Sequence, residues 1–392
     1  MKRIAIIELQ NIKYASRARK EAFSLSSYYK VFLLGADPYT NKNIIENNVN
    51  IIQYRIPYLI TSSRIKKAIN IFKFNYKIFI WLMKNNVDLV IMHNIKPMIS
   101  VITSKKLKHF NIIYDAHELH FNKRTNNNLI DNILKWIDYI NEKIILRHSK
   151  IVFQASYERA KYFANLHKTS IPIVIENHAN YVSVDPNIVI GNIFDNLPQG
   201  TKNIIYTGNI SWGGNQRIDK VICSLKYLDS SIHFCILGIG DLNIKQRLIQ
   251  YARTNGVENR IHYIDPVKSE LVVNVISKAN VAVIPIYAIC LNSKYSALNK
   301  LSQSLMAGLP IACSNYENLR KLVFENEVGQ VGDVFDVMSP RSIAQAINNC
   351  LQNENTYRQR ALELAKVRLN WEVQEEKLLK AVDLALRNNI NT

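Results

Sequence analysis

The chain alternates short, wholly apolar segments with longer amphipathic ones, and it does so in two separate series. Candidate strands of the first series are Ile4–Ile7, Val31–Leu34, Ile51–Tyr54, Leu89–Met92, Ile112–Tyr114, Ile151–Gln154 and Ile173–Ile175. Those of the second are Asn203–Tyr206, Phe234–Leu237, Ile261–Tyr263, Val281–Pro285 and Pro310–Cys313. Strands that are apolar on both sides and alternate with helices form parallel sheets covered by helices on both faces. The sequence therefore predicts an α/β protein with two doubly wound, Rossmann-like domains.

The length and the turn residues set the expected domain boundaries. At 392 residues the chain is too long for one compact core. Hydrophobic periodicity is lost between Glu176 and Thr201, where proline and glycine recur. We expect an N-terminal domain over residues 1–180, a linker over 181–200, a second domain over 201–360 and a C-terminal helix over 361–392 that returns to the first domain. Two such domains place a ligand cleft between them, at the carboxyl ends of the strands.

Cysteine usage and hydropathy indicate a cytoplasmic location. The five cysteines are scattered through the second half in apolar segments, and none has the spacing of a zinc site. This pattern favours a reducing compartment and predicts neither a disulfide framework nor a metal centre. The apolar run near the N-terminus is too short for a signal peptide, and no run reaches the ~18 apolar residues of a spanning helix.

Positive charge is concentrated in the first half of the chain. Residues 1–180 hold 28 Lys and Arg against 12 Asp and Glu, whereas residues 181–392 hold 22 against 19. In the predicted helix Ser63–Asn85, four lysines share one face: Lys66, Lys73, Lys77 and Lys84. Such a face suits an anionic membrane surface, and a purely solvated face is the alternative. We expect peripheral binding to the cytoplasmic face of the inner membrane. No nucleic acid is expected as a partner, because no recognised nucleic-acid module is present.

Glycines and cations follow successive strands of the second series. Gly208 and Asn209 follow one strand, and Arg217 and Lys220 open the next helix, where they could neutralise a diphosphate. Further strand-end residues are Gly238, Gly240, Asp265 and Val267. The GxG at Gly238 lacks the third glycine and the later acidic residue of a dinucleotide fingerprint. Each signal is weak alone, but strand ends of one parallel sheet converge on one crevice.

The stretch from Tyr295 to Asn315 predicts a polar turn, a helix, a glycine stop and a buried strand. Its polar positions are Tyr295, Ser296, Asn299, Lys300 and Gln303. The positive end of such a helix can hold a phosphate. An ordinary helix–strand unit without a ligand is the alternative.

Titratable side chains follow two strands of the first series. Asp115, His117 and Glu118 come directly after Ile112–Tyr114, and His93 with Asn94 follows the preceding strand. The two histidines could therefore face one cleft. A capping Asp and a structural His form the alternative.

Four motifs in this order resemble the GT-B glycosyltransferases, specifically the family 4 type that builds bacterial surface polysaccharides. They are IIYDAHELH, IYTGN, LGIG and ALNKLSQSLMAGLPIAC, and the tail around Trp371 resembles the terminal helix of that family. The last of the four is the most specific, and the resemblance runs nearly end to end. It implies transfer of a sugar from a nucleotide-sugar donor to an acceptor hydroxyl, with retention at the anomeric carbon and without an essential metal or other cofactor.

The resemblance also implies roles for particular residues. The donor nucleotide would lie on the second domain, with the base near Asp265–Val267 and the diphosphate at Arg217, Lys220 and the Ser296–Lys300 helix end. His117, with Asp115 and Glu118 beside it, would reach the donor sugar. The acceptor, a lipid-linked saccharide, would sit on the basic first domain. This sequence departs from the family in carrying Tyr295 and Gln303 where the family commonly carries two glutamates.

Two other functions remain compatible with the sequence. A nucleotide-sugar 2-epimerase of the same fold would convert its substrate without an acceptor. A non-catalytic subunit could keep the fold after losing the glutamates at positions 295 and 303. The basic first half of the chain disfavours the epimerase.

Overall fold

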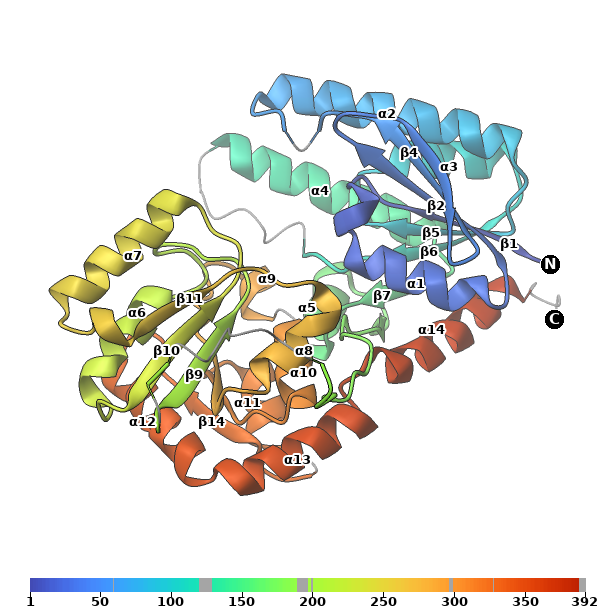
Figure 1. The fold of residues 1–392 in the computed structure, drawn as a ribbon. Coiled ribbons are helices and arrows are strands. Elements are labelled where there is room, and N and C mark those ends of the chain that lie inside the picture. Colours follow the sequence, from blue (N-terminus) through green and yellow to red (C-terminus); the bar gives the residue numbers. More distant parts are fainter. Residues whose placement is uncertain are drawn as a thin grey trace. The chain divides into compact units, whose positions relative to one another are not determined.

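The computed structural model describes residues 1–58, 60–119, 129–188, 197–198, 200–295, 299–326 and 328–387. The chain divides into two compact units, each with its own sheet: unit 1 comprises residues 1–177 and 374–392, and unit 2 comprises residues 178–373. Both units are layered α/β structures (Figure 1). Within the described residues no helix is both long enough and apolar enough to span a membrane.

Unit 1 is built on an eight-stranded sheet in the order β3-β4-β2-β1-β5-β6-β7-β8. The strands are β1 (Arg3–Ile7), β2 (Lys30–Asp37), β3 (Lys42–Glu46), β4 (Val49–Arg55), β5 (Leu89–His93), β6 (Asn111–Asp115), β7 (Ile151–Gln154) and β8 (Ile173–Val174). All neighbours pair in parallel except β3 and β4. The central strands are buried over their whole length, which explains their continuous apolar sequences.

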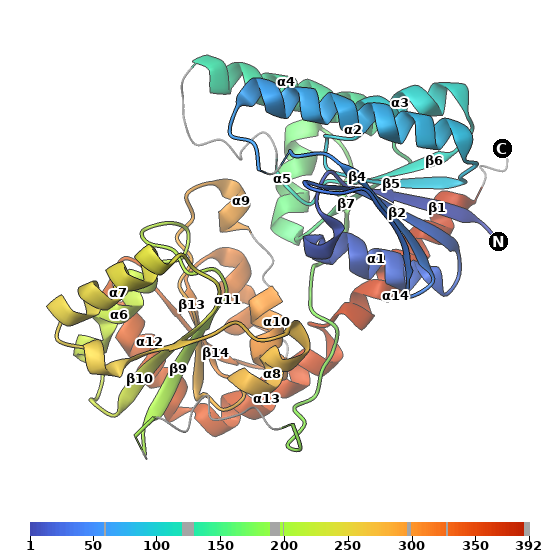
Figure 2. The ribbon, with the colours of Figure 1, turned by 45° about the horizontal axis from the view of Figure 1, so that its top comes forward.

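Helices cover both faces of this sheet. Its helices are α1 (Ser16–Ser26), α2 (Arg64–Lys84), α3 (Met98–Leu107), α4 (Leu129–His148), α5 (Tyr157–His167) and α14 (Trp371–Leu386). The helices α2, α3 and α4 lie along one face, whereas α1 and α14 lie along the other (Figures 1 and 2). Ser63 caps α2 by accepting a hydrogen bond from the Lys66 backbone N–H, so the helix begins where the sequence predicts.

Unit 2 contains a six-stranded parallel sheet in the order β11-β10-β9-β12-β13-β14. Its strands are β9 (Lys202–Thr207), β10 (Ile232–Leu237), β11 (Ile261–Ile264), β12 (Val281–Ile284), β13 (Ile311–Ser314) and β14 (Gly332–Phe335). Its helices are α6 (Ile218–Ser224), α7 (Leu242–Thr254), α8 (Val272–Ile276), α9 (Leu291–Lys294), α10 (Asn299–Met306), α11 (Glu317–Val323), α12 (Pro340–Gln352) and α13 (Glu354–Val367). One core cluster packs under α6, α7 and α12, and a second packs under α8, α10 and α11. The predicted doubly wound architecture is thus confirmed in each unit.

Two strands were absent from the sequence-based prediction. β3 pairs antiparallel with β4 across a turn at Asn47 and Asn48, whose φ angles of 46° and 61° suit a two-residue hairpin. The segment Lys42–Glu46 is mostly exposed at the sheet edge, so it lacks the apolar signature used to find the other strands. The second missed strand is β14, a four-residue strand beside β13.

The domain boundaries differ from the prediction in two places. Residues 178–180, expected in the first domain, and residues 181–188 of the expected linker belong to unit 2, where the Asp185 backbone N–H donates to Asn274 Oδ1 at 2.8 Å. The expected C-terminal helix is two helices, α13 in unit 2 and α14, most of which belongs to unit 1. Within unit 1 the Asn111 side chain donates to the Ala385 carbonyl at 2.7 Å, which ties the end of α14 to the first residue of β6.

The loops that follow β9 and β10 lie against each other so closely that a side chain at position 238 has no room. The Gly208 N–H donates to the Leu237 carbonyl at 3.0 Å, and the Ile210 N–H donates to the Ile239 carbonyl at 2.8 Å. A Cβ atom at Gly238 would stand 1.8 Å from the Gly208 carbonyl oxygen, and backbone cannot move aside as a flexible side chain can.

We therefore expect Gly238→Ala to destabilise unit 2 by about 1–3 kcal/mol or more, as overpacking does elsewhere. Gly214→Ala is the matched control, because its new Cβ would meet nothing closer than Ser211 Oγ at 3.4 Å. Urea unfolding, together with hydrogen exchange in β9 and β10, measures the stability of the two variants. Equal stability of the two variants would contradict this packing argument.

Candidate functional site

In each unit the polar residues gather where the order of the strands reverses. The strand β1 has β2 on one side and β5 on the other, and β9 likewise has β10 and β12. Connections run in opposite directions from such a point, so the strand ends leave a crevice there. Unit 1 has an ion-pair cluster at its reversal point, and unit 2 has a lysine beside glycine-rich backbone.

Asp115, the last residue of β6, is held by Arg17 from α1. The guanidinium donates from Nε to Asp115 Oδ2 at 2.6 Å and from Nη2 to Oδ1 at 3.1 Å. Its Nη1 donates to the Ile175 carbonyl at 2.6 Å. Burial alone would raise the pKa of Asp115, but Arg17, with His117 and His93, outweighs burial and holds that pKa well below its usual range. Asp115 is therefore a carboxylate.

His93, the last residue of β5, lies between two carboxylates. Its Nε2 is 3.0 Å from Glu21 Oε2 and its Nδ1 is 3.3 Å from Asp115 Oδ2. Burial would lower the pKa of this imidazole, yet Glu21 and Asp115 outweigh burial and raise the pKa to about 9. At neutral pH His93 is thus an imidazolium. Glu21 also lies 3.2 Å from Arg17 Nε, so two cations and two carboxylates compensate one another.

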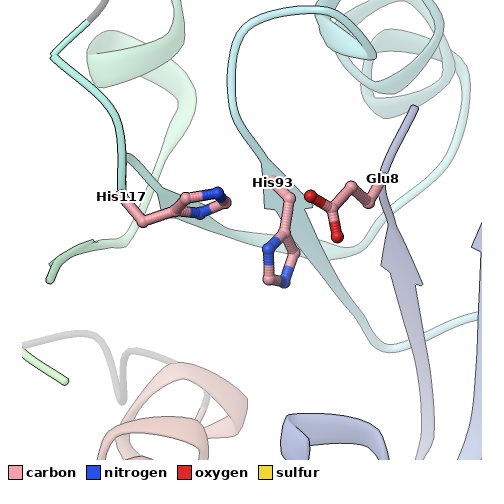
Figure 3. Close-up of side chains that lie close together, drawn as sticks. All are labelled: Glu8, His93 and His117. Carbon is pink, nitrogen blue, oxygen red and sulfur yellow. The ribbon is translucent and has the colours of Figure 1, made fainter. Parts of the chain in front are cut away.

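His117 is the member of this cluster that is open to solvent, with 19% of its side chain exposed. Its Nδ1 is 3.4 Å from Asp115 Oδ2, and its Nε2 is 3.2 Å from Asn94 Nδ2. A carboxylate on one side and an amide donor on the other favour the tautomer with the proton on Nδ1. Figure 3 shows the rings of His117 and His93 next to each other, with the Glu8 carboxylate beside His93.

The structure changes the role expected of Asp115. Its side chain is wholly buried behind His117, so it cannot touch a substrate and acts instead as a positioning residue. Glu118 follows His117 in the loop after β6 and is partly buried. His93 and His117 lie side by side, with ring centroids 5.4 Å apart, but His93 is wholly buried, so of the two only His117 can face a cleft.

Two sets of three side chains in the described residues could in principle bind a metal ion. They are Glu8, His93 and His117, and Glu21, His93 and Asp115, with ligand atoms within 4.8 Å of one another in each set. Both sets depend on His93, whose proton would have to leave before it could be a ligand. Arg17 already neutralises the carboxylates of the second set. The arrangement fits an ion-pair network better than a metal centre, and the expectation that no metal is essential stays a prediction.

In unit 2, Lys300 projects from the first turn of α10 toward the loop that follows β9. Its Nζ donates to Gln216 Oε1 at 3.0 Å and lies 4.7 Å from the centroid of the Tyr206 ring. A Cβ placed on Gly208, whose φ is +126°, would stand 3.7 Å from the same Nζ. Burial lowers the pKa of Lys300 to about 8. Among the described residues no carboxylate pairs with this ammonium.

The loop that carries Gln216 is fixed to the segment after β12. The Arg217 N–H donates to the Pro285 carbonyl and the Tyr287 N–H donates to the Asn215 carbonyl, both at 2.8 Å. These bonds set the Gln216 side chain opposite Lys300 without help from a ligand. The reversal point of unit 2 is therefore lined by a cation, an amide and exposed backbone near Gly208.

The structure does not bring Arg217 to Lys300. Its guanidinium instead makes two hydrogen bonds to Asp219, of 2.9 and 2.6 Å, and the first-turn carboxylate raises the pKa of Arg217. Arg217 would have to leave Asp219 to meet a diphosphate. Lys220 lies in the first turn of α6, partly buried and without an ion pair to any described residue.

The other residues predicted to bind the donor have the following positions. Gly238 and Gly240 pack against the loop after β9, so packing alone explains why both positions are glycine, whether or not a ligand binds there. Asn209 is exposed in that loop, Asp265 is exposed after β11, and Val267 packs on the second core cluster. Tyr295, Asn299 and Gln303 are partly buried at α9 and α10, and Asn299 Oδ1 is buried without a partner among the described residues. Ser296 lies outside the described residues.

Several residues of these sites escape prediction from sequence. Glu8 follows β1, and the strand-end rule that found His93 would have found it too. Arg17 and Glu21 are one turn apart on α1, where an ordinary surface ion pair is the simpler interpretation. Only the packing of α1 on the sheet shows that both are buried.

The fold of this chain is similar to that of several solved structures. No curated protein matches the sequence. The solved structure of sucrose-phosphate synthase from Thermosynechococcus elongatus is 16% identical with a TM-score of 0.80, covering 98% of this chain and 99% of that one. A glycosyltransferase from Rickettsia africae is 14% identical with a TM-score of 0.70 and 99% coverage of both chains. Anabaena HepE in complex with UDP-glucose is 11% identical with a TM-score of 0.70, covering 98% of this chain and 100% of that one.

Residues 201–353 match the family model described as glycosyl transferases group 1. The chain as a whole therefore has the GT-B fold of these glycosyltransferases, and the match to the family model is confined to unit 2. The matched residues contain β9 to β14 and every predicted donor-binding position from Gly208 to Gln303. Structural similarity at such low identity shows the fold alone, so the chemistry is argued from this chain's own residues.

The protonation of His93 gives the protein a pH-dependent stability that can be measured. The pKa of His93 is raised from 6.5 to about 9 on folding, so its contribution is complete below pH 6.5 and is lost as pH rises through about 9. The size of the contribution is roughly 3 kcal/mol.

Unfolding free energies of the native protein and of His93→Gln, measured below pH 6.5 and above pH 9, test this. The native protein should lose stability across the interval, and the variant should show a smaller loss. The same slope in both proteins would contradict a charged His93.

Proposed function

We propose that this protein is a glycosyltransferase that moves a sugar from a nucleotide-sugar donor to a hydroxyl of a lipid-linked saccharide, in the synthesis of a cell-surface polysaccharide. The observation that carries the proposal is Lys300, a partly buried ammonium beside Gln216 and Gly208 with no carboxylate partner among the described residues. A bound diphosphate would stabilise this ammonium by supplying negative charge and hydrogen-bond acceptors beside it. HepE from Anabaena, which shares the fold, has been solved with UDP and with UDP-glucose.

In the proposed reaction the bond between the anomeric carbon and the diphosphate oxygen breaks. The acceptor oxygen bonds to that carbon, and the proton of the acceptor hydroxyl is released. Negative charge grows on the leaving nucleoside diphosphate, where Lys300 and the backbone near Gly208 would stabilise it. Because the cation is fixed before the donor binds, little reorganisation is needed during the reaction.

His117 is proposed to contact the donor sugar. Asp115 holds its Nδ1–H, so Nε2 is left as a hydrogen-bond acceptor toward Asn94 or a sugar hydroxyl. Retention at the anomeric carbon and the absence of an essential metal are part of the proposal. Chelation with EDTA should leave turnover unchanged, and stereochemical analysis of the product tests retention.

Removing Lys300 should weaken nucleotide binding. We expect Lys300→Met to raise the Kd for UDP about tenfold to a hundredfold, because a hydrogen bond to a charged group typically contributes that much to binding. Calorimetry measures this, with the exposed Lys226→Met as matched control. Affinity should also fall as pH rises through about 8, where free Lys300 loses its proton. Undiminished binding by Lys300→Met would refute the site, and Lys220→Met or Arg217→Met would show which other cations serve it.

Removing the imidazole of His117 should impair turnover of the nucleotide sugar without weakening the binding of the nucleotide. We expect His117→Ala to lower kcat/KM for the nucleotide sugar about tenfold or more while the Kd for UDP stays the same. A loss of UDP affinity equal to the loss in kcat/KM would contradict this role. Conversion of the nucleotide sugar in the absence of any acceptor would instead indicate an epimerase.

A further inference from the structure

The outward face of α2 carries a row of exposed apolar side chains. Ile65, Ile69, Phe72 and Tyr76 are spaced four, three and four residues apart, which places them on one side of the helix. Their exposed fractions are 74%, 48%, 66% and 57%. The opposite side of α2 packs on the sheet through residues such as Phe74 and Leu82, so this outward row is additional to the core contact.

A second row lies on α4. Its members are Leu129, Ile133, Trp136, Ile137 and Ile140, with exposed fractions of 76%, 51%, 64%, 45% and 40%. The helix between the two, α3, adds the exposed Ile99 and Leu107. All three helices lie along the same face of the unit 1 sheet (Figures 1 and 2). Large exposed apolar patches on water-soluble proteins mark interaction sites, and so many exposed apolar side chains on one face point to such a site.

Positive charge borders the apolar rows. The exposed lysines of α2 are Lys66, Lys73, Lys77 and Lys84, which run along the helix beside the apolar row. Ile69 and Phe72 are exposed on the same helix as these lysines. Neither α2 nor α3 contains an Asp or Glu. On α4, Asp131 and Glu142 are buried and Asp138 is partly buried.

This combination selects among possible partners. A second copy of the chain would bring two lysine rows together, and their repulsion opposes such a dimer. A nucleic acid would meet the lysines but leave the isoleucines and the leucines without an apolar environment. A bilayer with anionic headgroups offers negative charge at its surface and hydrocarbon just beneath, so it accommodates both kinds of side chain.

We propose that α2, α3 and α4 form a docking surface by which unit 1 lies on an anionic lipid bilayer. The apolar rows enter the headgroup region, with Trp136 and Tyr76 at the depth that Trp and Tyr rings favour. The lysines stay at the phosphate level. This surface is independent of Lys300 and His117, so it extends the proposed function without depending on it. It would bring the enzyme to acceptors that are themselves held in a membrane.

Sedimentation with vesicles of phosphatidylcholine plus phosphatidylglycerol tests the proposal, compared with vesicles of phosphatidylcholine alone. Binding should require the anionic lipid and should weaken as salt increases. Lys73→Ala with Lys77→Ala should reduce partitioning about fivefold for each lysine removed. The exposed pair Lys226→Ala with Lys278→Ala in unit 2 is the matched control.

Phe72→Ser and Trp136→Ser should each lower partitioning about tenfold or more, because each removes a ring from the apolar rows. Leu384→Ser is the matched control, since Leu384 is 53% exposed on α14 at the other face of the sheet. Thermal unfolding and UDP binding should be the same in all variants, which separates docking from folding and from donor binding.

Three results would overturn the proposal: no sedimentation with anionic vesicles, equal binding to neutral vesicles, or unchanged partitioning of the lysine and aromatic variants. Concentration-dependent dimers that Phe72→Ser abolishes would assign the surface to a second copy of the chain instead.

Discussion

The proposed donor site depends on Lys300, an ammonium that no carboxylate among the described residues neutralises. Taking an ammonium out of water costs free energy, and the lowered pKa of Lys300 is a direct sign of that cost. Unit 1 shows how the same chain compensates buried charge when charge serves structure: Arg17 and His93 have Asp115 and Glu21 as partners. Lys300 has an amide oxygen and an aromatic ring. A diphosphate would supply the negative charge that the described residues do not place beside Lys300.

Topology explains why polar groups gather at one place in each unit. At β1 and β5 in unit 1, and at β9 and β12 in unit 2, neighbouring strands lead into connections that run in opposite directions. The apolar strands hold these ends rigidly, so Asp115 and His93 keep their positions through backbone that is buried on both faces. The unit 2 loops are fixed by their own hydrogen bonds and by the contact at Gly238. Each site is thus preorganised by the sheet beneath it.

The sequence predicts the parts of this architecture that leave a local signal. Wholly apolar strands are found almost to the residue, and Lys300, His93 and His117 are found because they follow strands or open a helix. Partners from distant segments are not found. Nothing near Arg17 shows that it pairs with Asp115 of β6, 98 residues later. The pairing of Arg217 with Asp219 is local, but it depends on side-chain conformations that the sequence does not specify. The exposure of Phe72 and Trp136 escapes prediction for the same reason, since an amphipathic pattern does not reveal which apolar side chains face the sheet.

The charge state of Lys300 tests the account most directly. Its side-chain signals can be followed by NMR across pH after isotope labelling, with Lys300→Met identifying the resonance. The account predicts a pKa of about 8 in the free protein and a rise toward the ordinary value of 10.5 when UDP is added. A pKa that UDP leaves unchanged would contradict the claim that this lysine binds the diphosphate.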